Sequence, residues 1–272
     1  MPSIKAKSQA MDDLFDDFLG EYLEESQTFS ILDAESWEDN EFPVTVREFI
    51  DSKDYLNMGN EIYPQIKELL SDVTSSRDYR TCYLEIGRDS GKSVFCSLLL
   101  VYRTYLLCRL KNPQKTFKLQ QDTELYNVNV STSGDQAKNV IFAAASSYVS
   151  HCPAMSKYIK KVKVEEIEFT KRIHLACASS AVASNLGYAM FTAICDESNF
   201  MKNSNGSNNI DDMTAALEGG LIRCPDDYLL CQVSSAAGPF AFLEENIKIM
   251  QAHPTFEDLT DYQTSVRAKE RN

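Results

Sequence analysis

The chain has 272 residues, of which 43% are hydrophobic, so it is long enough to bury a large core. Its formal net charge of −13 means that the surface as a whole repels nucleic acid, and a DNA contact would need a local basic patch. None of the eight cysteines forms a C-x-x-C pair, which argues against zinc and favours a reducing compartment. The apolar stretch at 94–108 is interrupted by Arg103 and is too short to cross a membrane, so we expect a soluble, intracellular protein.

The N-terminal part of the chain is acidic. Asp and Glu dominate residues 11–41, yet large apolar residues recur there at helical spacing. This pattern fits equally well an amphipathic helix docked on a partner or on the main domain, and a solvated arm. We predict an acidic helical N-terminal extension over 1–59. Residues 43–70 are expected to be helical with turns, and Pro64 is a favourable first residue for the last of these helices.

Strand-like and helix-like patterns then alternate, which predicts an α/β fold with a mostly parallel sheet flanked by helices. Five apolar runs predict strands at 81–86, 125–131, 172–179, 190–195 and 228–235. Helical patterns separate them at 91–111, 134–150 and 211–222. Alternation over 161–176 predicts a hairpin that turns around Glu165 and Glu166. The stretch 240–272 is expected to be helical and then polar, without strands, so we predict a main domain over 60–245 and a helical or linker tail over 246–272.

The segment 85–93, EIGRDSGKS, is typical of a phosphate-binding loop between a strand and a helix. The apolar residues after it recur on one predicted helix face: Val94, Phe95, Leu98, Leu99, Tyr102, Tyr105 and Leu106. Lys92 is expected to reach the β/γ-phosphates and Ser93 to bind Mg²⁺, while the first-turn amides favour an anion. The usual consensus has glycine where Ile86 stands, so the loop is a variant. The alternative is a helix entered through a flexible turn.

Two carboxylates follow the fourth predicted strand. Asp196 is expected to hold Mg²⁺ through water and Glu197 to polarise a water that attacks the γ-phosphate. Solvated strand ends are the alternative. The fifth run ends in Ser234, Ser235 and Ala236, whose position at a strand's carboxyl end suits a phosphate sensor or a plain turn.

The order of these motifs resembles the ATPase domain of the large terminase subunit of tailed bacteriophages, over roughly 60–245. The resemblance rests on Gln65, on the segments 87–93, 131–137, 186–198 and 233–236, and most specifically on Arg88 in the variant loop. It implies a P-loop NTPase fold of the RecA/ASCE-like kind that binds ATP and Mg²⁺ and drives double-stranded DNA into a capsid.

By this similarity each motif takes a role. Catalysis falls to Glu197, Arg88 and Lys92, metal binding to Ser93 and Asp196, and coupling to Ser234, Ser235 and Ala236. Nucleotide binding falls to Gly87, Arg88, Asp89, Ser90, Gly91, Lys92 and Ser93, with Gln65 on the adenine. The resemblance also implies a homo-oligomeric ring, a portal and a small terminase subunit as partners, and a host-cytoplasm location. Because the family's nuclease domain would not fit after the coupling motif, we expect no nuclease activity here.

The contact with DNA is a separate hypothesis. Lysines cluster at Lys157, Lys160, Lys161 and Lys163 and would meet backbone phosphates, or form a solvated hairpin face. Arg172 and Arg223 are candidates for an arginine given to a neighbouring subunit. Two other functions remain open: a helicase-like remodelling ATPase, and a non-hydrolysing adaptor that binds ATP.

Overall fold

The structure is a computed structural model, and it describes residues 32, 34–74, 79–87, 89–132, 137–179, 188–201, 210–224, 227–237, 241–251, 256–258 and 267–271. Residues 1–31 lie outside these ranges, so the acidic amphipathic helix stays a prediction. None of the helices in the described ranges is long and apolar enough to cross a membrane.

The elements follow each other along the chain as an α/β protein. The α-helices are α2(Val46–Asp51), α3(Pro64–Thr74), α4(Lys92–Arg109), α5(Pro113–Thr116), α7(Ala143–His151), α8(Pro153–Ser156), α10(Ile210–Leu221) and α11(Phe242–Gln251). The short helical turns are η2(Ala34–Ser36), η3(Glu38–Asn40), η5(Thr170–Arg172), η6(Ser198–Phe200) and the π-helix η4(Ala137–Phe142). The strands are β1(Tyr79–Glu85), β2(Leu125–Ser131), β3(Ile159–Val162), β4(Glu166–Phe169), β5(Ile173–Ser179), β6(Ala189–Asp196), β7(Leu229–Ser234), β8(Phe256–Asp258) and β9(Arg267–Arg271).

Within the described residues the strands form one nine-stranded sheet in the order β3-β4-β5-β2-β6-β7-β1-β9-β8. The five central strands, β5, β2, β6, β7 and β1, are parallel, and they are the five strands that the sequence predicts. The fold class is therefore confirmed. Because parallel strands end at the same edge, the residues that follow β1, β6 and β7 come together there. β7 lies between β1 and β6, so its last residue reaches the residues that follow both neighbours.

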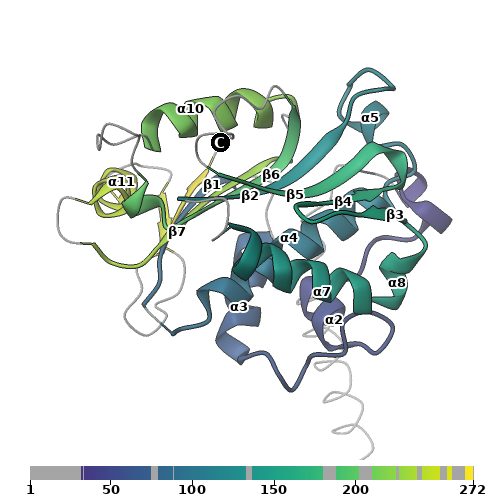
Figure 1. The fold of residues 1–272 in the computed structure, drawn as a ribbon, viewed down its shortest axis with the longest axis horizontal. Helices are drawn as coiled ribbons and strands as arrows, with labels where there is room; N and C mark the ends of the chain where they lie inside the picture. The colour runs from purple at the N-terminus through teal and green to yellow at the C-terminus, as the bar shows by residue number, and fades with distance from the viewer. Residues whose placement is uncertain are drawn as a thin grey trace, which may run out of the picture.

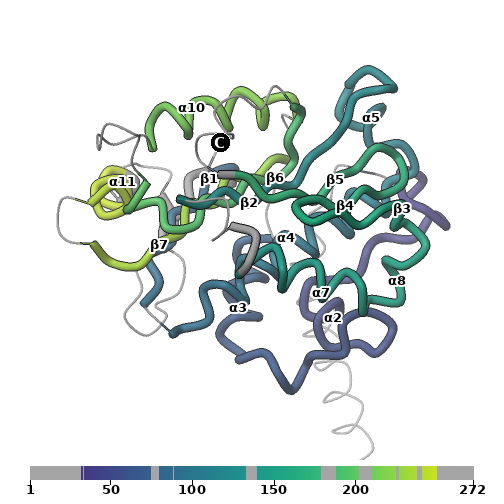
Figure 2. The backbone as a smooth tube through the Cα atoms, viewed as in Figure 1, coloured from purple at the N-terminus to yellow at the C-terminus, as the bar shows by residue number. Residues whose placement is uncertain are grey.

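Helices cover both faces of the sheet (Figure 1). α10 packs on β6 and β7, and α11 packs on β1, whereas α4 packs on the opposite face against β2, β5 and β6. The backbone tube shows α2, α3 and α7 together on the α4 side, with the green α10 on the other side (Figure 2). This is the layered arrangement expected when both faces of a parallel sheet are apolar.

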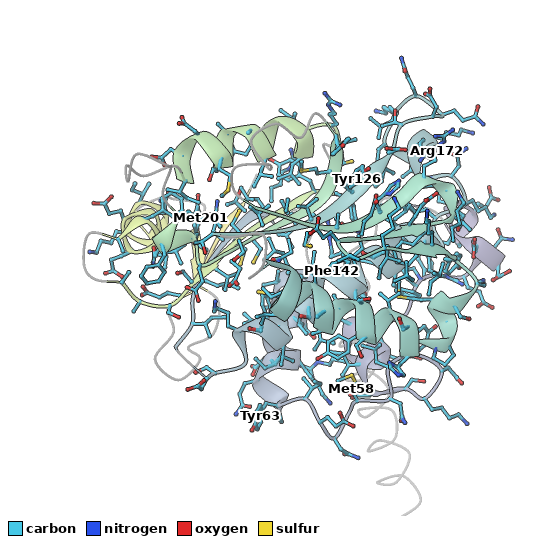
Figure 3. All side chains as sticks on the ribbon, viewed as in Figure 1. Met58, Tyr63, Tyr126, Phe142, Arg172 and Met201 are labelled. Atoms are coloured by element: carbon cyan, nitrogen blue, oxygen red, sulfur yellow. The ribbon has the colours of Figure 1, made fainter. Side chains whose placement is uncertain are left out.

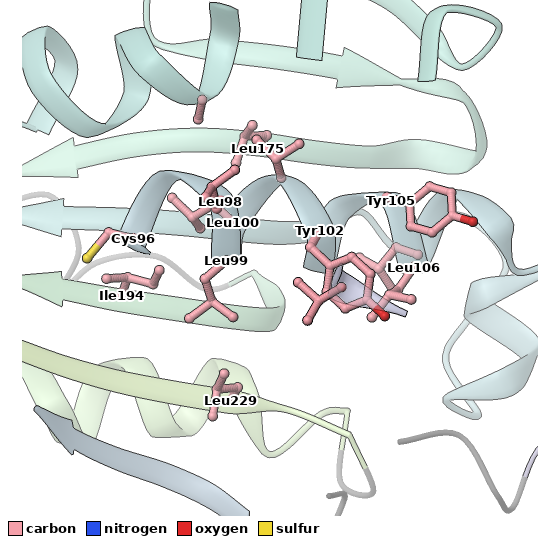
Figure 4. Packing of buried hydrophobic residues seen from close by; sticks show 14 of the residues in the cluster. Cys96, Leu98, Leu99, Leu100, Tyr102, Tyr105, Leu106, Leu175, Ile194 and Leu229 are labelled. Carbon is pink, nitrogen blue, oxygen red and sulfur yellow. The ribbon is translucent and has the colours of Figure 1, made fainter. Parts of the chain in front are cut away.

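The helix after the loop differs from its prediction. The sequence predicts one apolar face, but every residue of α4 from Phe95 to Cys108 is buried. The helix lies between the sheet and the outer helices, and its Leu98, Leu99 and Leu100 point in different directions into the core (Figure 4). Arg103 fits this site because its guanidinium group donates to the Thr192 hydroxyl at 2.9 Å.

The described part of the predicted extension belongs to the same core. Trp37, Phe49 and Ile50 are fully buried in the cluster that contains α4. The Phe49 ring lies 4.8 Å from the Tyr105 ring, centroid to centroid. A boundary near residue 60 remains a prediction, but the side chains on either side of it share one hydrophobic cluster.

The predicted hairpin at 161–176 is confirmed as β3 and β4, which turn at 163–165, and β4 also pairs antiparallel with β5. The end of the chain differs from the sequence prediction. The prediction that 240–272 has no strands is wrong, because β9 pairs antiparallel with β1 and β8 pairs with β9. The sequence of β9, RAKER, is polar, so it contains no apolar run that would predict a strand.

Candidate functional site

The loop between β1 and α4 starts from a buried anchor. Ile86 is fully buried, and its backbone N–H donates to the Ser234 carbonyl oxygen at 2.9 Å, which ties the end of β1 to the end of β7. The Ser90 N–H donates to the Gly87 carbonyl oxygen at 3.3 Å and makes the turn compact. Arg88 lies outside the described residues, so its contact with a phosphate stays a prediction.

Gly91 is the residue at which this loop becomes α4. Its φ of 86° lies in the left-handed region that favours glycine. A Cβ atom at this position would lie 3.0 Å from Ile66 Cδ1, which is tighter than most real contacts. The same close approach places α3, which carries Ile66, against the loop.

The first turn of α4 has the properties of an anion site. Its leading N–H groups have no carbonyl one turn earlier, and the helix dipole adds partial positive charge there. Lys92 and Ser93 occupy this turn. The Ser97 hydroxyl bonds the Ser93 carbonyl at 2.8 Å and the Ile141 carbonyl at 3.0 Å. The start of α4 is therefore joined to the π-helix η4, which follows β2.

Lys92 brings the predicted residues of two motifs together. Its ammonium group donates to Asp196 Oδ1 at 2.5 Å and to Glu197 Oε1 at 2.7 Å. The Asp196 side chain is 5% exposed and that of Lys92 13% exposed, so water screens this pair little. Residues far apart in the chain, at the start of α4 and the end of β6, thus form one charged cluster.

Glu197 is held from a second side. The Ser234 hydroxyl donates to its Oε2 at 3.1 Å, so each carboxylate oxygen has a partner. The backbone of Glu197 has φ 58° and ψ 39°, a left-handed conformation that is uncommon outside glycine. Such outliers persist where the surroundings fix them and are frequent at functional sites. Here the outlier turns the Glu197 side chain toward Lys92.

The two carboxyl groups differ in their electrostatics. Burial raises the pKa of Asp196, and the attraction of Lys92 only partly offsets this effect. Burial also acts to raise the pKa of Glu197, but the bonds from Lys92 and Ser234 outweigh it and lower the pKa. Burial acts to lower the pKa of Lys92, and the two carboxylates outweigh it and raise the pKa. A charged Lys92 therefore faces an ionised Glu197.

The donor set also fits a divalent cation that takes few ligands from protein. Asp196, Glu197 and the Ser93 hydroxyl are hard oxygen donors of the type that Mg²⁺ prefers, and the Lys92 ammonium pairs with both carboxylates. Within the described ranges no three His, Cys, Asp or Glu side chains gather as a metal cage. A metal bound here would therefore complete its shell with phosphate oxygens and water.

Comparison with known proteins assigns the chain to a family. Residues 11–217 match the family described as "Uncharacterized protein MJ0330, N-terminal P-loop domain". The chain belongs to this MJ0330 N-terminal P-loop domain family. A P-loop domain is a nucleotide-binding fold of NTPases, and the match gives that coarse assignment. No curated protein matches the sequence.

Solved structures similar to this MJ0330-family domain include bacteriophage large terminases. The large terminase of bacteriophage HK97 has a TM-score of 0.51 at 20% identity over 76% of this chain. The chain covers 40% of that protein, so it corresponds to less than half of its length. The likeness confirms the fold that the motif order predicts. The Thermus phage P74-26 large terminase ATPase domain mutant gives a TM-score of 0.44 at 13% identity, covering 71% of this chain and 73% of that one.

Three further predicted residues lie near the cluster with less defined roles. Gln65 is exposed in the first turn of α3, next to the Ile66 that contacts Gly91. Ser235 is buried directly after β7, and Ala236 is exposed. Their assignment to adenine and to coupling stays a prediction.

The predicted DNA-binding lysines of this MJ0330-family domain lie on the β3 side of the sheet. Ion pairs neutralise three of them: Lys157 with Glu38, Lys160 with Glu168, and Lys163 with Glu166. Lys161 is exposed between them. The cluster therefore has less net positive charge than its sequence indicates.

The two arginine candidates lie far from Lys92. Arg172 directly precedes β5 and Arg223 precedes β7, so both are at the amino ends of parallel strands, while the loop is at the carboxyl ends. Figure 3 shows Arg172 on the other side of the molecule from Met201, which follows the Glu197 turn. Within one chain neither arginine can reach the cluster.

Sequence reasoning missed Asn199 as a site residue. Its side chain bonds the Ser235 carbonyl oxygen and the Leu243 N–H, at 3.0 and 2.8 Å. The available signal was a polar residue two places after Glu197, which alone is too common to single out.

Proposed function

We propose that this domain binds ATP with Mg²⁺ and hydrolyses it. The supporting observation is the cluster in which Lys92, at the start of α4, holds Asp196 and Glu197 while Ser234 holds Glu197 from the other side. An anion site, a mobile cation and a positioned carboxylate are the parts that phosphoryl transfer to water requires. The family match and the terminase-like fold agree with this assignment.

In this proposal the loop residues Gly87, Asp89, Ser90 and Gly91 surround the phosphates and Arg88 extends over them. The amides of the first turn of α4 donate to phosphate oxygens. The Lys92 ammonium exchanges its two carboxylates for the β- and γ-phosphates, which its flexible side chain permits. Ser93 and Asp196 would hold Mg²⁺, whose positive charge would offset the negative charge that develops on the phosphates.

The departure of Lys92 would activate Glu197. With the ammonium 2.7 Å away, Lys92 is a principal cause that keeps the pKa of Glu197 low. Once the ammonium moves to a phosphate, the pKa rises and the carboxylate becomes a stronger base. Ser234 keeps the carboxylate in position to orient an attacking water. The base is therefore activated by the arrival of its substrate.

We further propose that hydrolysis drives the translocation of double-stranded DNA, as in a viral genome-packaging motor in the host cytoplasm. Under this proposal the subunits form a homo-oligomeric ring that works with a portal and a small terminase subunit, and Ser234, Ser235 and Ala236 couple hydrolysis to movement. Gln65 contacts the adenine. Lys161 and the paired lysines meet DNA phosphates, with the glutamates released on binding.

The test compares the parent protein with Glu197→Gln. We expect the variant to bind a fluorescent ATP analogue with parental affinity and to release phosphate at least ~10²-fold more slowly. Glu245→Gln, which removes an exposed carboxylate from α11, is the matched control and should leave the rate unchanged. Each protein is assayed with and without duplex DNA. Parental turnover by Glu197→Gln would contradict the proposal, and binding without any turnover by the parent would favour the adaptor instead.

A further inference from the structure

The turn that carries Glu197 is fastened to β7. After β6 ends, the Phe200 N–H donates to the Glu197 carbonyl oxygen at 2.8 Å and closes the turn η6. The buried Ser198 hydroxyl donates to the Val233 carbonyl oxygen at 3.4 Å. The Asn199 Nδ2 group donates to the Ser235 carbonyl oxygen at 3.0 Å. These bonds join the Glu197 turn to the end of β7.

The same Asn199 side chain caps a helix that lies elsewhere in the chain. Its Oδ1 atom accepts from the Leu243 N–H at 2.8 Å, and Leu243 is the second residue of α11. A helix usually takes this bond from the side chain just before it, but Ala241, whose carbonyl oxygen accepts the Glu245 N–H at 3.0 Å, has no side-chain oxygen. Asn199, which follows the carboxyl end of β6, supplies the missing cap.

α11 connects the Asn199 side chain with strands outside the Lys92 cluster. Its Leu243 and Ile247 pack on Tyr83 of β1, and the helix also contacts β8 and β9. Its first residue lies beside β1, since the Phe242 ring is 6.4 Å from the Tyr83 ring, centroid to centroid. The helix therefore contacts the strand that leads into the loop and the two C-terminal strands.

We propose that Asn199 is a positioning residue that links the nucleotide site to α11: one amide fixes the Glu197 turn to β7 and, at the same time, caps α11. This inference rests on the hydrolysis proposed above and adds the route by which it moves a second element. Binding of a triphosphate draws Lys92 from Glu197, the turn adjusts, and the amide of Asn199 transmits the adjustment to the start of α11.

The two hydrogen bonds can be separated by substitution. Asn199→Asp keeps an oxygen acceptor for the Leu243 N–H, and a carboxylate at a helix N-terminus is favourable. It removes the donor that bonds the Ser235 carbonyl. Asn199→Ala removes both bonds. Asn246→Ala is the matched control, because the Asn246 amide donates to the Phe242 carbonyl within α11 at 2.8 Å and does not reach the site.

The experiment measures ATP turnover, affinity for an ATP analogue and hydrogen exchange of the α11 amides with and without that analogue. For Asn199→Asp we expect a parental melting temperature, nucleotide affinity within about twofold, a kcat lower by ~10- to 100-fold, and no change of α11 exchange on nucleotide binding. Asn199→Ala should also show faster α11 exchange in the absence of nucleotide. Asn246→Ala should keep the parental kcat and the parental exchange response.

The outcomes separate this inference from the proposed function. If Asn199→Asp hydrolyses ATP at the parental rate and α11 still responds to nucleotide, the link through Asn199 is refuted while hydrolysis stands. If both Asn199→Asp and Asn246→Ala lose activity and stability to the same extent, the amide is merely structural and the inference fails. If the parent neither binds nor hydrolyses ATP, the proposed function fails and this inference falls with it.

Discussion

The Lys92 ammonium lies 2.5 Å from the Asp196 carboxylate, so the residue expected to bind phosphate now neutralises the residue expected to hold the metal. Under the proposed function the two roles require an exchange of partners. Phosphate would take Lys92 away from Asp196, and Mg²⁺ arriving with the nucleotide would replace its positive charge. The buried carboxylate would then never be left without a cation.

Asp196→Asn tests the metal part of this exchange. The amide cannot supply the charge that favours a divalent cation, so we expect the Mg²⁺ concentration for half-maximal nucleotide binding to rise ~10- to 100-fold. Binding in EDTA should be unchanged or tighter, because Lys92 loses a competitor. Titrations of Mg²⁺ against a fluorescent ATP analogue give both numbers. The exposed Asp211→Asn is the control, and an unchanged Mg²⁺ requirement in Asp196→Asn would remove Asp196 from the metal site.

Lys92→Ala should destabilise the free protein in a pH-dependent way. Removal of the ammonium leaves Asp196 and Glu197 side by side without a cation, which we expect to cost roughly 3 kcal/mol near neutral pH. Both carboxyl groups then have folded-state pKa values above their unfolded values, so protonation stabilises the fold. The deficit relative to the parent should therefore shrink as the pH falls from 7.5 to 5.

Denaturant titrations across this pH range measure the deficit. Lys248→Ala is a suitable comparison, since it breaks an exposed pair with Glu244 at 3.2 Å and should cost under about 1 kcal/mol at every pH. A Lys92→Ala deficit that does not vary with pH would show that packing, rather than charge, dominates.

Glu38→Gln tests a second ionic cluster, which fastens the N-terminal segment to the core. Lys171 lies 2.6 Å and Lys157 3.2 Å from the Glu38 carboxylate, and the Tyr158 hydroxyl donates to it. Burial acts to raise the pKa of Glu38, but these partners lower it from 4.5 to about 2. Its folded pKa is below its unfolded pKa, so its contribution is complete above about pH 5 and disappears as the pH falls toward 2.

We expect Glu38→Gln to lose roughly 2–3 kcal/mol at pH 7 and to approach the parent as the pH falls below about 4.5. Urea midpoints at several pH values measure this gap. Glu35→Gln, an exposed neighbour, should stay within about 0.5 kcal/mol of the parent throughout. An equal loss for Glu38→Gln at pH 7 and pH 2.5 would contradict the ionic account.

Gly91→Ala and Gly219→Ala should have opposite effects. Gly91 has φ 86° and a Cβ there meets Ile66, so we expect a loss of about 1–2 kcal/mol and weaker nucleotide binding. Gly219 lies in α10 with nothing within 4 Å of an added Cβ, so alanine should stabilise the protein by roughly 0.5–1 kcal/mol. Thermal melts and nucleotide titrations of both variants measure the difference. Equal effects at the two positions would refute the conformational argument.

The parallel core was predictable because its strands are short runs rich in apolar residues. β2 and β6 are buried along their whole length, and apolar residues predominate in their sequences, LYNVNVS and AMFTAICD. The C-terminal strands were not predictable in this way, since the sequence RAKER of β9 has no apolar pattern and is recruited by pairing with β1. The local sequence pattern therefore predicts the apolar central strands, but not β9, whose strand conformation depends on its pairing with β1.

The candidate site divides along the same line. Lys92, Asp196 and Glu197 were found because their motifs are contiguous in sequence and their chemistry is specific. Asn199 and Ile66 matter through contacts with distant partners, Leu243 and Gly91, and no short sequence window contains such a pair. The left-handed backbone of Glu197 was also invisible, because residues other than glycine reveal it only through tertiary structure.

The place of β1 in the sheet has a consequence for the folding of the protein during its synthesis on the ribosome. Its partners β7 and β9 both come from the far end of the chain, and Thr81 pairs with Leu230, about 150 residues later. During synthesis β1 is therefore made early, and it cannot pair with β7 or β9 until most of the domain has been synthesised. Nucleotide binding by a growing chain should begin only after β7 has left the exit tunnel, which makes it a marker for the completion of folding.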